Sequence, residues 1–252
     1  MDIDRLPLPR ENKTIWALFH EESPRNTPIF MHEKALNLFN FSSTFNKNSD
    51  VPIPLYHLES LDAVTTTRYF VNTSIKNSIL NEISPIVFFQ SNCYTFTGRD
   101  EYVTTLMKYI KVDSYGLCLH NKDIDLPTLS KNPLVDDELM NVLAKYKFMI
   151  AIENAACIDY VTEKFWRAIE LGVVPIYYGS PLIRDWLPNN KSAILLEDFP
   201  TPKLLSQYLR YLLQNNSAYE EYLEHKTLGI ISNRKLSDEI SAREYDKTLL
   251  IT

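Results

Sequence analysis

The sequence predicts an α/β fold built on a mostly parallel sheet. Apolar runs at residues 148–152 and 173–178 are typical of strands buried on both faces. They alternate with helical patterns of about ten residues, at 162–171 and 202–213. Strands that alternate with helices in this way form βαβ units, and these units place their strands parallel in one sheet.

The first part of the chain holds two expected strands. Residues 15–19 form an apolar run, which predicts a buried strand. A polar, proline-containing stretch follows at 21–28, then a short helical pattern at 32–38. Residues 39–45 alternate apolar and polar side chains as a strand does. Residues 46–58 carry two prolines and little periodicity, so we expect a loop there.

The second part begins near residue 84 and has a more regular pattern. Residues 86–89 predict a buried strand, residues from about 100 to 110 a helix, and residues 121–133 a polar loop. The expected elements after this loop are a helix at 134–146, the strand at 148–152, the helix at 162–171, the strand at 173–178, a short strand at 193–196 and the helix at 202–213.

The composition excludes several function classes. Only 5 of the 252 residues are glycine, and their spacing allows neither the dinucleotide fingerprint G-x-G-x-x-G nor the P-loop. The net charge of −6 argues against a nucleic-acid or anionic-membrane partner. The 5 histidines form no H-x-x-x-H pair, so no zinc site is expected. No apolar run reaches the roughly 18 residues that a membrane-spanning helix needs.

The cysteines and the sequons bear on the redox compartment. The 3 cysteines form no C-x-x-C pair and no disulfide framework, so we expect buried thiols or a single disulfide among Cys93, Cys118 and Cys157. The first residues lack the apolar core of a signal peptide. N-x-[ST] sequons, which permit glycosylation in the secretory pathway, begin at Asn12, Asn40, Asn72, Asn190 and Asn215.

One strand-to-helix connection is rich in polar residues. It runs from Glu153 to the helix that Thr162 is expected to cap and Gly172 to end. A polar connection that leads into a helix N-terminus is suited to bind an anion. In parallel sheets ligands bind beyond the carboxyl ends of the strands. The expected binding edge therefore comprises the strand ends at 91–92, 153–154 and 179–180.

Three charged residues near this edge each have two interpretations. Lys164 lies in the first helical turn, where a cation is disfavoured by about 0.3–1 kcal/mol unless a bound phosphate compensates; otherwise it is a solvated lysine paired with Glu163 or Glu170. Glu163 can hold two ribose hydroxyls or be an acid stabilised by the helix dipole. Arg99 can bind a diphosphate or pair with an adjacent acid.

Other polar residues also have two interpretations each. Asn154 and Tyr160 can orient a nucleotide, or can close a turn and pack. Glu22 directly follows an expected strand and can be a general base, or it is a loop acid. The D-x-D triplet at 123–125 is typical of metal-dependent nucleotide-sugar sites, but its place in a polar, proline-bounded loop favours an ordinary loop.

These residues carry a resemblance to a known family. The block FMIAIENAACIDYVTEKFWRAIELGVVPIYYGSP at 148–181 resembles the donor-binding motif of the fucosyltransferases of glycosyltransferase family 10. Residues 87–116 are similar to the second motif of that family, and WALFHEESPRNTP at 16–28 is similar to its acceptor-side segment. The residues of these motifs are most similar to the branch called alpha-(1,3)-fucosyltransferase 10 and 11. The resemblance covers about residues 14–235.

The resemblance implies a GT-B architecture, with two Rossmann-like halves that face a cleft. It implies inverting transfer of L-fucose from GDP-β-L-fucose, which is a substrate, with no cofactor and no metal. Inversion is a single displacement, which needs one base and positive charge at the leaving diphosphate. By the same resemblance Glu22 is the general base, Arg99 and Lys164 hold the diphosphate, and the other donor-binding positions are Asn92, Asn154, Tyr160, Thr162 and Glu163.

The resemblance also sets expectations for organisation and partners. It divides the chain into an acceptor-side half at 1–82, which looks truncated, a GDP-fucose-binding half at 83–235, and a C-terminal tail at 236–252. The acceptor is either N-acetylglucosamine of a glycan, through an alpha-1,3 linkage, or Ser/Thr of a protein. The alternative is a non-catalytic truncated homologue that binds GDP-fucose or a partner. Family members are type II membrane proteins of the Golgi or endoplasmic reticulum lumen, and we expect membrane association only through a segment missing from this chain.

Overall fold

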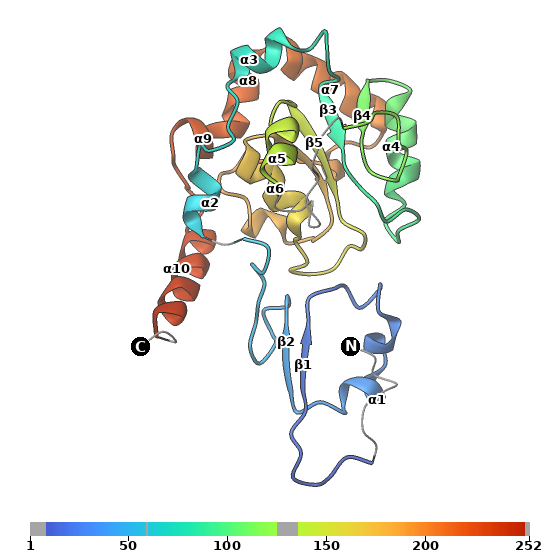
Figure 1. Cartoon of the computed structure of the whole chain (residues 1–252), viewed down its shortest axis with the longest axis vertical. Coiled ribbons are helices and arrows are strands. Elements are labelled where there is room, and N and C mark those ends of the chain that lie inside the picture. Colours follow the sequence, from blue (N-terminus) through green and yellow to red (C-terminus); the bar gives the residue numbers. More distant parts are fainter. Residues whose placement is uncertain (1–8, 59, 125–135, 250–252) are drawn as a thin grey trace.

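The computed structural model describes residues 9–58, 60–124 and 136–249, and it shows an α/β fold with two parallel sheets (Figure 1). The larger sheet has the strand order β4-β3-β5-β6-β7, and β1 pairs with β2 in the smaller one. The strands are β1 Ala17–His20, β2 Phe41–Thr44, β3 Ile86–Phe88, β4 Val112–Ser114, β5 Phe148–Ile152, β6 Val174–Tyr178 and β7 Ile194–Leu195. The helices are α1 Glu33–Leu36, α2 Leu61–Thr65, α3 Thr73–Ser78, α4 Arg99–Met107, α5 Asp137–Leu143, α6 Glu163–Leu171, α7 Pro202–Gln214, α8 Asn216–Glu220, α9 Glu224–Thr227 and α10 Arg234–Leu249.

The larger sheet confirms the prediction of a parallel sheet covered by helices on both faces. All its strand pairs are parallel. Alternate residues of β5 point to opposite faces: Ile150 packs with α4 and α7, whereas Ala151 packs with α6. Both faces exclude water, so every residue of β5 is buried. This explains why the strand is apolar throughout instead of alternating.

Helix α6 begins and ends where its sequence predicts. The Thr162 side chain accepts a hydrogen bond from the backbone N–H of Lys164, and Gly172 ends the helix at a φ of 61°. A Cβ at Gly172 would also lie 2.4 Å from the Phe70 ring, so both backbone conformation and space require glycine there.

The first expected strand forms, but the prediction that it is buried is wrong. In β1 only Leu18 is buried, and Phe19 is 54% exposed. The cause is that β1 pairs only with β2, so the small sheet has no helices over both faces. The expected strand at 39–45 is confirmed as β2, which is also partly exposed.

Several elements lie where no prediction was made. Helices α2 and α3 have 5 and 6 residues and strand β4 has 3, so they are too short to show a clear periodicity. Helix α10 crosses the expected boundary between 235 and 236, and its Leu236 and Ile240 are buried in one cluster with Val64 of α2. Of the expected helix at 134–146, residues 137–143 are helical, and its first two residues lie outside the described part of the chain. Within the described ranges, no helix has the length and apolarity to cross a bilayer.

Candidate active site

Buried polar atoms without a partner mark the carboxyl edge of the larger sheet. The ten such side-chain atoms found in the described part of the chain include three in segments that follow strands of the larger sheet: Arg99 Nε, Asn154 Oδ1 and Asp159 Oδ1. A fourth, His20 Nε2, lies at the end of β1 in the smaller sheet. Buried polar groups are normally hydrogen-bonded, so a cluster of unsatisfied ones indicates a place where a ligand can supply the missing partners.

The centre of this edge is a buried carboxylate, Glu153, at the end of β5. Its Oε1 accepts from the backbone N–H of Thr162 at 2.8 Å, and its Oε2 accepts from the Thr162 hydroxyl at 2.7 Å. The same hydroxyl accepts from Lys164 Nζ at 2.9 Å, and Lys164 Nζ lies 3.5 Å from Glu153 Oε2. Burial raises the pKa of Glu153, against the opposing effect of Lys164. The connection from β5 to α6 is thus closed by one charged network.

Lys164 is a buried cation at the N-terminus of α6. Its Nζ pairs with Glu163 Oε1 at 3.0 Å, and only 9% of its side chain is exposed. Burial opposes its charge, but Glu153 and Glu163 outweigh burial and raise its pKa. For Glu163, too, neighbouring charges outweigh burial. Burial favours its protonated form, but Lys164 and other nearby cations hold its pKa at about 2. Glu163 Oε2 also lies 4.0 Å from His57 Nε2.

Arg99, the first residue of α4, is buried without a carboxylate partner among the described residues. One guanidinium nitrogen donates to the carbonyl of Ile152 at 3.1 Å, and the other terminal nitrogen donates to the carbonyl of Asn92. Its Nε and the hydroxyl of Tyr102 are both buried and unpartnered. Both residues line a cavity of about 220 Å³ whose other walls are Thr97, Ile152, Tyr178, Leu196 and Glu197.

The two asparagines of the candidate set differ. The side chain of Asn92 is exposed, and only its backbone carbonyl contacts another candidate, Arg99. Asn154 is buried, its Oδ1 has no partner in the described structure, and its side chain hydrogen-bonds Tyr160. Asn154 therefore belongs to the interior of the site, whereas Asn92 contributes through its main chain.

Glu22 from the first part of the chain reaches the carboxyl edge of the larger sheet through Tyr160. Glu22 Oε1 accepts three hydrogen bonds: from the Tyr160 hydroxyl, from the N–H of Ser23 at 2.7 Å and from Asn26 Nδ2 at 3.0 Å. No described residue hydrogen-bonds its Oε2. Burial opposes ionisation of Glu22, but these hydrogen bonds and the charge of Lys164 outweigh burial and lower its pKa.

Other contacts join the two parts beside this point. The backbone N–H of Lys47 donates to Asp159 Oδ2 at 3.2 Å, and the Phe45 ring lies 5.0 Å from that of Tyr160. Asp159 has a φ of 62°, which is uncommon for a residue other than glycine. The backbone at the interface is therefore held in an unusual conformation next to Tyr160.

The candidate set omitted Glu153, Asp159 and His57. Glu153 has a recognisable signal, since an ionisable residue directly after a wholly apolar strand must find buried partners. The sequence around Asp159 does not indicate its contact, because Asp159 accepts a hydrogen bond from Lys47, which is distant in the chain. His57 lies in an expected loop, and its approach to Glu163 follows from how that loop packs.

The structure also shows where the cysteines and the D-x-D triplet lie, and whether either could bind a metal. Cys93 and Cys118 form a disulfide, which confirms one of the two interpretations of the cysteines, and Cys157 is free. The one group of metal-ligating residues found in the described ranges contains these same two cysteines, whose sulfurs are already joined. Of the D-x-D triplet, Asp123 is exposed and contacts His120, while Asp125 lies outside the described residues.

The sequence and the fold match one family. The model described as Glycosyltransferase family 10 (fucosyltransferase) C-term matches residues 81–244. A mouse protein named GDP-fucose protein O-fucosyltransferase 3 is 48% identical over 97% of this chain and 51% of its own length. The Drosophila melanogaster Alpha-(1,3)-fucosyltransferase B is 48% identical over 95% of this chain and 55% of its own. The chain thus spans about half the length of the curated relatives it matches.

Solved structures support the same fold. An alpha1,3-fucosyltransferase crystal structure is 22% identical, has a TM-score of 0.58, and is matched over 96% of this chain and 79% of its own. A crystal structure of alpha1,3-fucosyltransferase with GDP-fucose has a TM-score of 0.57 at 21% identity, over 85% of this chain and 67% of its own. The fold is α/β and consistent with the GT-B type. The family match, the relatives and the parallel sheet agree: this chain belongs to glycosyltransferase family 10, the fucosyltransferases.

Proposed function

We propose that this chain carries the active site of a GDP-fucose-dependent fucosyltransferase, which transfers L-fucose from GDP-β-L-fucose with inversion. One observation carries the proposal: the Glu22 carboxylate is hydrogen-bonded to Tyr160 of the donor-side connection, close enough to Lys164 for that charge to lower its pKa. A base and a cation at one sheet edge are what a single displacement requires.

Arg99 and Lys164 hold the diphosphate of the donor in this proposal. Arg99 is bound only to backbone carbonyls, so its charge is free to meet a phosphate. Lys164 lies at the N-terminus of α6, where the helix dipole also favours an anion. Glu163, ionised at neutral pH, accepts from the ribose hydroxyls. Asn154, with its unpartnered Oδ1, contacts the donor directly.

The remaining donor groups occupy neighbouring positions. The cavity beside Arg99 receives part of the diphosphate, because Arg99 Nε and the Tyr102 hydroxyl are unpartnered donors in its wall. Thr162 positions the N-terminus of α6, and Asn92 acts through its carbonyl on Arg99. The donor half extends from about residue 83 and includes the start of α10, whose Leu236 is buried in its core.

Glu22 is the general base of the transfer. Three donors hold its Oε1, so Oε2 is left to accept the proton of the acceptor hydroxyl. Its lowered pKa keeps it ionised at neutral pH. As that proton leaves, the acceptor oxygen forms a bond to fucose C1, and the bond from C1 to the phosphate oxygen breaks. The electrons of the broken bond go to GDP, and Arg99 and Lys164 stabilise the added charge.

For the acceptor we propose Ser/Thr of a protein in the secretory pathway. The support is that relatives from mouse and human, at 48% and 47% identity, are named GDP-fucose protein O-fucosyltransferase 3. The Drosophila relative named Alpha-(1,3)-fucosyltransferase B is equally similar at 48%. Transfer to N-acetylglucosamine is therefore the outcome that an acceptor screen must separate from transfer to Ser/Thr.

The test is calorimetric binding of GDP together with transfer of labelled fucose to protein and glycan acceptors. We expect Glu22→Gln to keep GDP affinity and lose about 10²–10⁴ of the transfer rate, and Lys164→Met to weaken GDP binding. Glu21→Gln is the matched control, since it removes the adjacent exposed carboxylate. GDP binding without transfer to any acceptor would refute catalysis and leave a donor-binding homologue. Absence of GDP binding would refute the site as a whole.

A further inference from the structure

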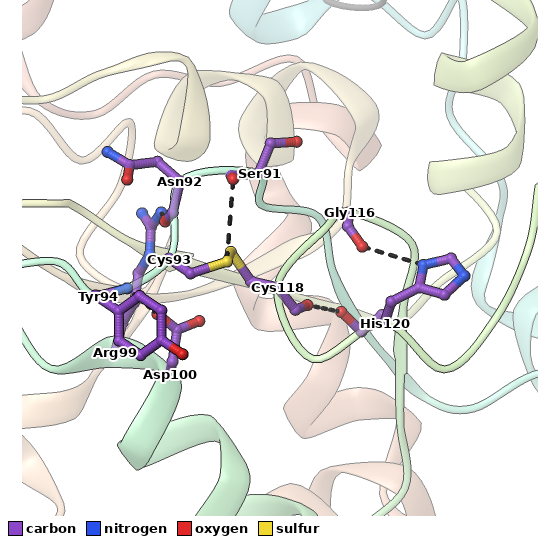
Figure 2. The surroundings of a disulfide bond; sticks show 10 residues. Ser91, Asn92, Cys93, Tyr94, Arg99, Asp100, Gly116, Cys118 and His120 are labelled. Carbon is purple, nitrogen blue, oxygen red and sulfur yellow. Dashed lines mark hydrogen bonds between the residues drawn. A yellow bond between two sulfur atoms is a disulfide. The ribbon is translucent and has the colours of Figure 1, made fainter.

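We propose that the Cys93–Cys118 disulfide is a positioning element for Arg99, so that breaking the cross-link weakens binding of a nucleoside diphosphate specifically through that guanidinium. The inference rests on the proposed function, because it takes Arg99 as a diphosphate ligand. Figure 2 shows the cross-link between two loops, with Arg99 lying next to the turn that carries Cys93.

The disulfide joins the loops that follow two neighbouring strands. Cys93 follows β3, Cys118 follows β4, and these strands are parallel, so both loops lie at the carboxyl edge of the sheet. The two Cα atoms are 5.5 Å apart, and the cysteines have a sequence separation of 25 positions. The cross-link therefore fixes the loop before α4 to the loop after β4.

The start of α4 is bound to the turn around Cys93. Arg99 donates to the carbonyl of Asn92, the residue before Cys93. The backbone N–H of Tyr94, the residue after Cys93, donates to Asp100 Oδ2 at 3.1 Å. The first two residues of α4 thus each contact a neighbour of Cys93, and any displacement of that turn moves the acceptor that holds Arg99.

Apart from its burial, Arg99 is held by few contacts. The N-cap residue of α4 is Gly98, at a φ of 61°, and no side chain caps the helix. A Cβ at Gly98 would meet no atom within 4 Å, so the chain there is loosely surrounded. No described carboxylate forms an ion pair with Arg99. Its two hydrogen bonds go to backbone carbonyls, and one of them lies in the cross-linked turn.

Both loops adopt a strained backbone directly after the cysteine. Tyr94 has a φ of 60° and Leu119 a φ of 54°, and they are two of the three non-glycine residues with positive φ in the described chain. Left-handed conformations are unfavourable for side chains of this kind. Tyr94 is 99% exposed, so packing of its ring does not hold the conformation. Tyr94 is held by the hydrogen bond to Asp100, and Leu119 packs against the hydrophobic core. The cross-link adds a covalent restraint beside each of them, and without it we expect the turn around Cys93 to relax.

The experiment compares the oxidised full chain with the Cys93→Ser, Cys118→Ser double variant, using GDP and guanosine as probes in calorimetry. We expect the double variant to bind GDP about tenfold more weakly, equivalent to about 1.4 kcal/mol, with guanosine affinity unchanged. Cys157→Ser is the control, because it removes the free thiol and leaves the cross-link, and it should bind GDP as the wild type does.

A double-mutant cycle separates positioning from general loosening. In an Arg99→Ala background, loss of the disulfide should change GDP affinity by less than about twofold, since the residue it positions is gone. An equal loss in both backgrounds, or no loss in either, would overturn the proposal while leaving GDP binding by the wild type intact. A wild type that does not bind GDP would overturn the proposed function as well.

A rescue variant tests the conformational cause. Adding Tyr94→Gly to the serine pair removes the penalty of positive φ in the turn around Cys93 without loss of packing, so that turn can keep its shape without the cross-link. This variant should bind GDP within about threefold of the wild type, and it remains informative if the serine pair alone fails to fold. Failure of this glycine to restore GDP affinity would contradict the role assigned to backbone strain.

Discussion

Replacing the Thr162 hydroxyl by a methyl group should destabilise the protein well beyond an ordinary helix cap. In Thr162→Val the side chain keeps its shape but loses three polar contacts: with the N–H of Lys164 at 3.4 Å, with Lys164 Nζ at 2.9 Å and with Glu153 Oε2 at 2.7 Å. A lost N-cap costs about 1 kcal/mol. A buried hydrogen bond to a charged group is worth about 1.5–3 kcal/mol.

The free energy of unfolding should therefore fall by about 2–4 kcal/mol, since Lys164 keeps Glu163 as a partner. For a chain of this size each kcal/mol lowers Tm by about 2–4 °C, so the melting temperature should drop by roughly 5–15 °C. The assay is thermal and denaturant unfolding of the wild type, Thr162→Val and the matched control Thr162→Ser, which retains the hydroxyl. A valine variant within about 0.5 kcal/mol of the wild type, or a serine variant as unstable as valine, would refute the reasoning.

Three further predictions concern pH and packing. Burial lowers the pKa of Lys226 to about 7 from its ordinary 10.5, so between these values only the unfolded chain binds that proton. Lys226 should therefore contribute up to about 1.4 kcal/mol per pH unit to the rise of stability with pH, and in denaturant titrations Lys226→Met should reduce the slope by that amount while the buried Lys147 and Lys76 keep their own contributions. Tyr160→Phe removes a donor that lowers the pKa of Glu22, so the acidic limb of the pH–rate profile for fucose transfer should move to higher pH, and an unchanged limb would exclude Glu22 as the base. Gly116→Ala would place a Cβ 2.0 Å from the carbonyl oxygen of Gln90, a clash with backbone that should prevent accumulation of folded protein in expression trials.

Features that depend on local sequence were predicted well. The strand at 148–152 was predicted with its observed bounds, because a wholly apolar run of that length is characteristic of a strand buried on both faces. The cap at Thr162 and the stop at Gly172 were found because hydroxyl side chains and glycine satisfy the ends of a helix in a known way. Short polar elements such as β4 were missed, because their pairing with a neighbouring strand, and not their own side chains, makes them strands.

Features that depend on contacts between distant residues were not predictable from a pattern. The prediction that β1 is buried was wrong, because an apolar run does not reveal how many strands join the sheet it belongs to. The sequence left three pairings open for its 3 cysteines, and the parallel arrangement of β3 and β4 selected Cys93 with Cys118. The role of Glu153 as the centre of the charged network depends on where α6 begins in space.

Short-range patterns were sufficient to predict the α/β class, the family and the polar connection that leads into α6, because strand and helix periods and end signals lie within a few residues of each other. The packing of the folded chain was needed to show that Glu22 meets Tyr160 across 138 positions of the chain, and that Arg99 hydrogen-bonds the residue next to a disulfide cysteine. The physical reason is that a hydrogen bond forms within about 3 Å, and which distant groups come that close is set by the packing of whole elements.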